Sequence, residues 1–458
     1  MSTFAPCIII KQQIKMNRYI ILLISLAGFL SIQGQEIKQF SLQEAIDYAM
    51  ENNYTVISAE MDVESAKYQV KESTSIGLPQ IDASVKYNDN IARPVMILPP
   101  EMVQPGMSNE IQFGTKYDAS FGASVNQLIF SGEYIVGLQA ARKYLDKTNT
   151  DFFRNKVEVK QMVSDAYFAA LGAQRALVVI DSTLKVTRNL ADETQEIYNV
   201  GFAEDIDVDQ LNLLVSDLEA NNIYFENQLM ISHAYLKFYL GLGENDSITL
   251  TDNMESMIES RHNSGLISDP FNVYENLDYL SVAKQKDLSY LQVRLEKASY
   301  MPTLSANLYY QTQAQREEWN FFDSGGKWYS SSALGITMAI PVFSSGMRRS
   351  KVKMAQIAYD QTGVLQQQLE TQLRIQYNSA KTEYMNAYRV YENKQLNRRT
   401  AEKIFNVTTQ KYLQGMASSL DILNTHTQFL NAESDYINSA KGVLTASEEL
   451  QKILAKEE

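Results

Sequence analysis

A tyrosine, a glycine and an aspartate recur with identical spacing in the two halves of the chain. The first set is Tyr198, Gly201 and Asp207, and the second is Tyr412, Gly415 and Asp421. The glycines fit helix C-caps, because a helix that reverses direction needs a residue tolerant of positive φ. Carboxylates beside such a turn can contact cations or a partner, and they can also stabilise the start of the next helix through its dipole. The helix-end role is preferred for the neighbouring Glu204 and Asp205, whereas both roles remain open for the two repeated aspartates.

The histidines and the familiar catalytic motifs argue against an enzyme. Three histidines, His233, His262 and His426, lie in separate segments that lack the spacing of metal ligands. The sequence has no glycine-rich phosphate loop and no nucleophile elbow. We therefore expect no catalytic site, no cofactor and no metal centre.

One proline-rich loop, Ile91 to Gly114, offers a different kind of chemistry. It carries Met96, Met102 and Met107, and methionine sulfur is a soft ligand that suits copper(I). A copper or silver exporter is therefore one interpretation of this loop. The preferred interpretation is a loop stiffened by proline, in which methionine is an apolar filler.

Composition excludes other classes of protein. The formal net charge of the 458 residues is −13, which argues against nucleic acid as a partner because a phosphate backbone needs a basic face. Glycine and proline, at 20 and 9 residues, are too scarce for a disordered or collagen-like chain.

The N-terminal residues have the pattern of a secretory signal. Basic residues precede an apolar run from Tyr19 to Leu30, and small or polar residues follow it. We assign residues 1–35 to a signal peptide and leader, with Met16 as a candidate start and cleavage near residues 34–35. A membrane anchor is the alternative, but the run is shorter than the roughly 20 residues that a spanning helix needs. The single cysteine, Cys7, lies in this leader, so we expect a mature chain without cysteine.

The rest of the chain is predicted to repeat one unit twice, with a linker at residues 243–270. The first repeat covers residues 36–242: a helix from about Ser41 to Ser75, a β-hairpin at 81–130, a long helix at 131–200 and a return helix at 203–240. The second covers residues 271–458: a helix, a β-hairpin at 303–343, a long helix at 344–412 and a return helix at 417–454. No run after the leader is apolar enough to predict a spanning helix, so strands are the expected membrane segments.

Local patterns carry these assignments. Ser41 is a candidate N-cap with Glu44 at the capping-box position. Apolar and polar residues alternate from Ile81 to Tyr87, as in a half-buried strand. The second hairpin carries aromatic residues near its strand ends: Trp319, Phe321, Phe322 and Trp328. Such residues suit the boundary between water and lipid in a membrane barrel, and the core of a small sheet is the alternative.

The two long helices share a stripe of apolar and small residues. In the first helix the steps alternate between four and three, which defines a heptad seam: Val159, Val163, Ala166, Ala170, Ala173, Leu177, Ile180, Leu184, Thr187, Ala191, Thr194 and Tyr198. Adding 214 to each number gives the second seam: Leu373, Tyr377, Ala380, Tyr384, Ala387, Tyr391, Lys394, Arg398, Ala401, Phe405, Thr408 and Tyr412. Lys394 and Arg398 are its charged exceptions. Each helix spans on the order of 100 Å and must pack against its neighbours.

Four strands per chain are too few to close a transmembrane barrel, and an open sheet edge cannot face lipid. Three chains would supply twelve strands, which is a permitted even number. The expected fold class is therefore α+β. It consists of a trimeric, 12-stranded outer-membrane β-barrel that continues into an α-helical coiled-coil barrel on one side of the membrane.

Several motifs occur in order and in duplicate: strand starts at Pro79 and Pro302, strand-to-helix junctions at 128–132 and 341–346, and the two tyrosine–glycine turns. From about Phe40 to the C-terminus, this set resembles the TolC family of outer-membrane efflux channels. The resemblance implies a homotrimer in contact with outer-membrane lipid of a Gram-negative bacterium. It also implies passive export of small molecules or peptides, in efflux or type I secretion. An inner-membrane RND, ABC or MFS transporter would pass them on through a periplasmic adaptor.

In that family the glycine turns form the periplasmic tip, where coiled helices close the pore. The resemblance implies gate positions at Tyr412, Asp207 and Asp421, with Tyr198, Gly201, Asp205 and Gly415 also at the tip. A ring of Asp421 from three chains would attract cations at a constriction. The family's second ring aspartate falls on Asn424 and its gate arginine falls on Ala417, so this chain lacks those two charges.

Two other classes remain open from the residues alone. A structural or adhesive coiled-coil protein of the cell envelope would share the heptads, but it would not need hairpins flanked by aromatic residues. A periplasmic adaptor also carries a helical hairpin, but it needs a lipoyl-like β-domain that we do not find. Drug, metal and peptide export all fit the sequence.

Overall fold

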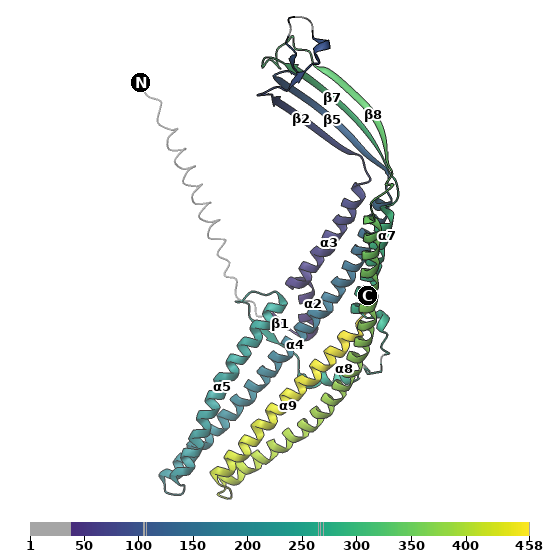
Figure 1. The fold of residues 1–458 in the computed structure, drawn as a ribbon. Helices are drawn as coiled ribbons and strands as arrows, with labels where there is room; N and C mark the ends of the chain where they lie inside the picture. The colour runs from purple at the N-terminus through teal and green to yellow at the C-terminus, as the bar shows by residue number, and fades with distance from the viewer. Residues whose placement is uncertain are drawn as a thin grey trace, which may run out of the picture. The chain divides into compact units, whose positions relative to one another are not determined.

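The computed structural model describes residues 38–103, 106, 108–263, 265, 267–268 and 270–457 (Figure 1). The predicted signal peptide and leader, including Cys7, lie outside the described residues. The chain divides into two compact units, which we call the helical unit and the strand unit. The helical unit contains the described residues up to 53, then 162–263 and 389–445, and the strand unit contains 54–161, 264–388 and the residues from 446. Each unit draws segments from both predicted repeats.

The strand unit contains an antiparallel sheet in the order β2 (Gln80–Asp89), β5 (Tyr117–Phe130), β7 (Thr303–Arg316) and β8 (Tyr329–Ala339) (Figure 1). One row across its four strands is apolar: Ile81, Val125, Leu308 and Leu334. A row that lies three positions further along β2 is polar or small: Ser84, Gly122, Gln311 and Ser331. Because successive side chains point to opposite faces, the sheet has an apolar face and a polar face. Strands β2 and β8 are its edges, and all their residues are exposed.

The two β2–β5 and β7–β8 connections lie at the same end of the sheet. The first contains β3 (Val95–Ile97), paired with β4 (Glu110–Gln112), and the 3-10 turn η1 (Pro100–Met102). Met96 is in β3 and Met102 is in η1, whereas Met107 lies outside the described residues. In the second connection Phe321 is buried and packs on Tyr87, with ring centroids 5.9 Å apart. Strand β8 ends at Ala339, four residues before the predicted end, because Pro341 follows closely and cannot donate to a ladder.

The predicted single helix from Ser41 to Ser75 is two helices, α2 (Leu42–Asn52) and α3 (Tyr54–Ser75). The predicted capping box is present, since the Ser41 N–H donates to the Glu44 carboxylate at 2.8 Å and the Ser41 hydroxyl accepts from the Glu44 N–H. The break falls at Asn53, whose backbone is extended. Its side chain donates to the carbonyl of Tyr239 at 2.7 Å. This bond reaches a residue far along the chain, so the local sequence pattern does not predict the break.

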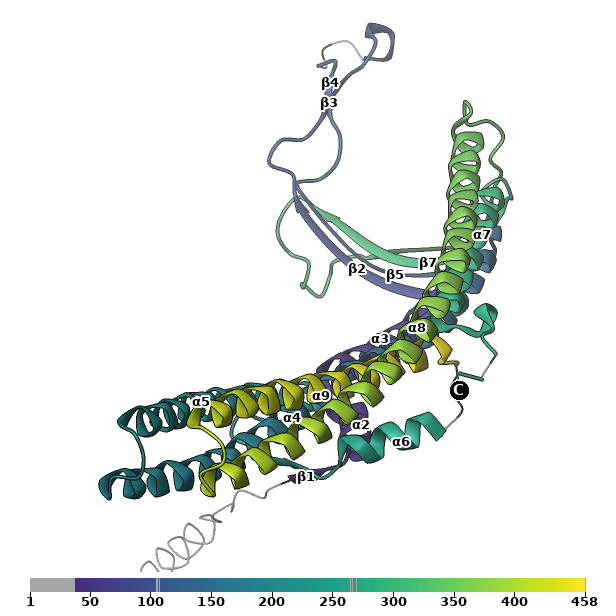
Figure 2. The same cartoon turned by 90° about the horizontal axis from the view of Figure 1, so that it is seen from below.

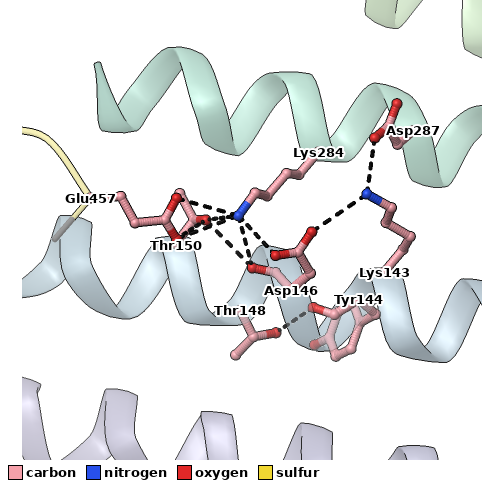
Figure 3. A network of polar contacts seen from close by, with 8 residues as sticks. All are labelled: Lys143, Tyr144, Asp146, Thr148, Thr150, Lys284, Asp287 and Glu457. Atoms are coloured by element: carbon pink, nitrogen blue, oxygen red, sulfur yellow. Dashed lines mark hydrogen bonds and ion pairs between the residues drawn. The ribbon is translucent and has the colours of Figure 1, made fainter. Parts of the chain in front are cut away.

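A polar cluster joins α4 (Gly132–Asn199), α7 (Leu277–Ala298) and the C-terminal residues within the strand unit (Figure 3). The Lys284 ammonium lies 2.9 Å from Asp146 Oδ1, 2.6 Å from Thr150 Oγ1 and 3.4 Å from Glu457. Burial raises the pKa of the Asp146 carboxyl, but the bonds to Lys284 and Lys143 outweigh burial and hold that pKa below its usual value. The cluster fixes the chain end that follows α9 (Ser419–Leu454).

In the helical unit the predicted linker at 243–270 contains regular structure. Strand β6 (Ile248–Leu250) pairs in parallel with β1 (Lys38–Phe40), and α6 (Met254–Asn263) follows. The Tyr167 hydroxyl donates to the carbonyl of Phe40 at 2.9 Å and lies 3.0 Å from Asp252. A three-residue strand is too short to leave an alternating pattern, so the sequence does not indicate β6 within the linker.

Parts of two helical hairpins complete the helical unit: α4 with α5 (Asp205–Leu240), and α8 (Met347–Leu413) with α9. The first seam is buried from Val159 to Thr194, except for the half-buried Leu177. In the second seam, Lys394 pairs with Asp435 at 2.6 Å and Arg398 lies 3.5 Å from Glu433. These ion pairs with α9 explain the two charged seam positions.

In the described part of the chain, helix α4 contains a stretch that is long and apolar enough to cross a membrane. This corrects the expectation that no run after the leader is apolar enough for a spanning helix. Just over half of that stretch is buried within the fold. Core helices meet the same criterion, and its small residues pack against α9, as with Gly172 beside Ile437.

Candidate functional site at the hairpin tips

Both hairpins turn at a glycine in the left-handed region, at the same end of the helical unit (Figure 1 and Figure 2). Gly201 has a φ of 84° and Gly415 a φ of 69°, which side-chain-bearing residues rarely adopt. The Phe202 N–H donates to the carbonyl five residues back at 3.0 Å, and the Met416 N–H does the same at 2.8 Å. Each turn is therefore a Schellman cap that sends the return helix back alongside the long helix.

The repeated aspartates both stand at the third position of a return helix. The Asp421 carboxylate accepts from the Ser418 N–H at 2.9 Å and from the Ser418 hydroxyl at 2.7 Å. The Asp207 carboxylate accepts from the Glu204 N–H at 3.3 Å. These are capping-box bonds, and those from Ser418 hold the pKa of the exposed Asp421 carboxyl below its usual value. The helix-end role that the sequence left open is thus present in both copies.

A second set of bonds joins the two hairpins to each other. The Ser419 hydroxyl, on α9, donates to the Asp207 carboxylate on α5 and lies 2.8 Å from the side-chain oxygen of Gln210. The Tyr412 hydroxyl on α8 lies 3.0 Å from Thr194 Oγ1 on α4. Because the Thr194 hydroxyl donates to the carbonyl of Leu190, the Tyr412 hydroxyl is the donor. We call these contacts of Asp207, Ser419, Tyr412 and Thr194 the tip link.

The tip link distinguishes the two aspartates that the duplication makes equivalent. Asp207 is half-buried and bonds across to the other hairpin, whereas Asp421 is exposed and bonds within its own first turn. The residue that corresponds to Ser419 in the first copy, 214 positions earlier, is Asp205. Burial raises the pKa of the Tyr412 phenol, and the charge of Asp207 raises it further, so the phenol stays protonated as a donor.

The structure therefore brings together only part of the residues implied by the resemblance. Asp207 and Tyr412 both take part in the tip link, each in its own hydrogen bond, and the two glycines form the turns. Tyr198, Asp205 and Asn424 are exposed. The sequence did not point to Ser419, which is 3% exposed, because a serine just after an N-cap serine carries no signal for a contact across hairpins. Thr194 appeared only as a seam position.

Behind the tip link, a hydrophobic core holds all four helices together. Phe405 of α8 and Phe429 of α9 are stacked, with ring centroids 5.8 Å apart, and they pack with Leu211 and Leu218 of α5. Further from the turns, the buried Glu433 carboxylate lies 3.3 Å from Arg175 of α4 and 3.5 Å from Arg398 of α8. This pairing compensates the burial of a charge. These contacts hold the two hairpins together.

Comparisons with known proteins agree with this fold. The chain matches the family described as outer membrane efflux protein over residues 45–242 and 275–456. It is 22% identical to outer membrane protein TolC of Vibrio cholerae over 419 residues, which cover 87% of this chain and 88% of that protein. Outer membrane protein TolC of Salmonella enteritidis is 22% identical over 442 residues, or 93% of this chain and 84% of that protein.

Solved structures share the fold at lower identity. The outer membrane protein VceC from Vibrio cholerae aligns with a TM-score of 0.68 and 16% identity, covering 91% of this chain and 96% of that one. The CmeC outer membrane channel of Campylobacter jejuni aligns with a TM-score of 0.71 and 16% identity, covering 90% and 85%.

A four-stranded sheet with two long, capped helical hairpins defines a channel-type envelope protein of mixed helices and strands. The chain belongs to the outer membrane efflux protein family. The predicted resemblance to the TolC family is confirmed. The protein is an outer-membrane export channel, with its helical part in the periplasm. Its relatives are channels and not enzymes.

Proposed function

We propose that three copies of this chain close a 12-stranded β-barrel in the outer membrane and continue it as a periplasmic helical barrel. The observation that carries the proposal is the sheet, which has an apolar face, a polar face and two exposed edges. In lipid, each unpaired backbone group at an edge costs several kcal/mol. Pairing of β8 with β2 of the next copy removes both edges, and the apolar face then meets outer-membrane lipid.

The helices support the same assembly. Helix α5 exposes an apolar stripe at steps of seven, four and three residues: Tyr224, Ile231, Tyr235 and Phe238. Each of these side chains is about half or more exposed in the single chain. A stripe of this kind marks an interaction surface. In the proposed trimer, a helix of the neighbouring copy packs on it.

We further propose that an inner-membrane RND, ABC or MFS transporter and a periplasmic adaptor deliver small molecules or peptides to this channel. The tip link would hold the periplasmic end closed at rest, and docking of the adaptor would release it. The ring of Asp421 from three chains would then line the entrance as fixed negative charge, without a second acidic ring because Asn424 is neutral. The gate would rely on Ser419 and Tyr412, because Ala417 offers no charge.

Disulfide trapping tests the barrel. The mature chain is expected to lack cysteine, so Ser84→Cys in β2 can be combined with a cysteine at Tyr329, Ser331 or Ala333 in β8, which lie on the same polar face. We expect one of these pairs to crosslink chains into covalent trimers in isolated outer membranes. Ser84→Cys with Gln311→Cys is the matched control, since β7 is an inner strand of the sheet. A protein that stays monomeric and never crosslinks through β2 and β8 would refute the trimeric barrel.

Crosslinking at the tip tests the export partners. A cysteine at Asn199, the last residue of α4, carries a photoactivatable group in intact cells, and captured proteins are identified by mass spectrometry. We expect a periplasmic adaptor, and the transporter that purifies with it indicates the substrate class. A cysteine at Ser84 in the sheet is the control site and should not capture an adaptor. Labelling of Asn199→Cys by impermeant reagents from outside the cell would contradict the periplasmic tip.

A further inference from the structure

A cavity of about 500 Å³, partly open to solvent, lies in the helical unit between the α4–α5 hairpin and helix α9. Small residues of α4 leave the space, among them Gly172, Ala173 and Ala176. Phe225 of α5 and Leu430 of α9 form apolar wall opposite them. This volume is within the range of about 300–1,000 Å³ that is typical of small-molecule sites.

His426 also lines this cavity and is the unusual member of its wall. The side chain is 1% exposed, and its ring packs edge-on against Phe405, with centroids 5.4 Å apart. Neither ring nitrogen has a hydrogen-bond partner among the residues that the structure describes. A buried polar group without a partner is destabilising, so a ligand that supplies a partner gains binding energy at this position.

The charges around the cavity favour a neutral ligand. Burial lowers the pKa of the His426 imidazole to about 4, so at neutral pH the ring is uncharged and has one donor and one acceptor. Glu433 is already paired with Arg175 and Arg398. The two other charged residues at the cavity, Asp217 and Lys441, have opposite signs. The cavity therefore presents no unbalanced charge that a charged ligand would need.

We propose that this cavity binds an uncharged, compact molecule with an apolar body and one hydroxyl or amide group that hydrogen-bonds to His426. Such a molecule contacts α4, α5 and α9 at once and holds the two hairpins at their present spacing. The site is formed within one chain, so the proposal does not rest on the export role or on the trimer.

Photolabelling of the purified full chain in detergent tests the site. The probe is a phenol that carries a trifluoromethyl diazirine, and labelled peptides are mapped by mass spectrometry. We expect labels on the cavity segments of α4, α5 and α9, with competition by 2-naphthol. Its isostere 2-methylnaphthalene lacks the hydroxyl and should compete about fivefold more weakly, the typical value of one net hydrogen bond. Labelling spread evenly over the chain, or unaffected by 2-naphthol, would overturn the proposal.

Two variants identify the residues responsible. His426→Leu should make 2-naphthol and 2-methylnaphthalene compete equally, and this double comparison cancels partition into detergent. A fivefold preference that survives in His426→Leu would refute hydrogen bonding to this ring. Ala176→Leu should fill the cavity and abolish site labelling. Gly442→Leu, with open space around its Cβ position, is the matched control on α9 and should label normally. Normal labelling of Ala176→Leu would place the ligand elsewhere.

Discussion

The Ser419 hydroxyl ties helix α9 to Asp207 of helix α5, and Ser419→Ala removes this tie without changing backbone conformation or side-chain volume appreciably. A hydrogen bond to a charged group contributes about 1.5–3 kcal/mol, and the lower value is appropriate because Asp207 is only half-buried. Three independent links in the proposed trimer add to about 4.5 kcal/mol, or on the order of a thousandfold in the ratio of closed to open channels. We therefore expect a large increase in resting conductance.

Single-channel recording in planar bilayers measures this ratio directly. Ser418→Ala is the matched control, since its hydroxyl bonds only to Asp421 within the same turn. Losing this N-cap weakens the start of α9 by about 1 kcal/mol but leaves the contact between hairpins in place. We expect the Ser418→Ala channel to remain mostly closed. Equal conductance of Ser419→Ala and the unmodified channel, or equal opening by both variants, would refute the role of the tip link.

Three further perturbations follow from the contacts and the shifted pKa values. Tyr412→Phe removes the bond to Thr194 and should also raise resting conductance. The pKa of the Tyr412 phenol is raised in the folded chain, so this bond should hold below pH 10 and weaken above it. Conductance recorded as a function of pH measures this change. The pKa of His426 falls from 6.5 to about 4 on folding. About 3 kcal/mol of folding stability should therefore be lost as the pH falls from 6.5 through 4. In denaturant unfolding, His426→Leu should lose less stability over this pH range. Lys284→Met should lower the free energy of unfolding by about 2 kcal/mol, because it removes the cation from two partly exposed carboxylates, Asp146 and Glu457. The exposed Lys185→Met should lower it by about 0.5 kcal/mol.

The elements of the fold could be predicted where the sequence carries long periodic signals. The alternation from Ile81 and the heptad steps from Val159 each involve many residues, so single exceptions do not hide them. Elements set by one contact were missed. The break at Asn53 depends on a carbonyl of Tyr239 that is distant in sequence, and strand β6 is too short for a pattern.

The candidate site was predicted less completely, for a related reason. The glycine turns follow from backbone conformation, which is a local property, and both glycines have positive φ. The resemblance also implied Asp207 and Tyr412. Ser419 and His426 could not be predicted, because one acts through a bond to another hairpin and the other through a cavity in the packing. The spacing of residues in the sequence indicates neither a bond between two hairpins nor a cavity between packed helices.

Duplication of the hairpin explains why Asp207 and Asp421 share the role of helix cap. It also explains why only Asp207 has a second role, in the link between the hairpins. Both cap their own helix, which is the function that a copied turn retains automatically. A link between hairpins needs a donor on one side and an acceptor on the other, so two identical copies cannot supply it with two carboxylates. The serine at position 419, where the first copy has Asp205, provides the donor. Ser419→Asp would restore identity between the copies, place two carboxylates together and repel the hairpins. We expect this variant to conduct more than Ser419→Ala.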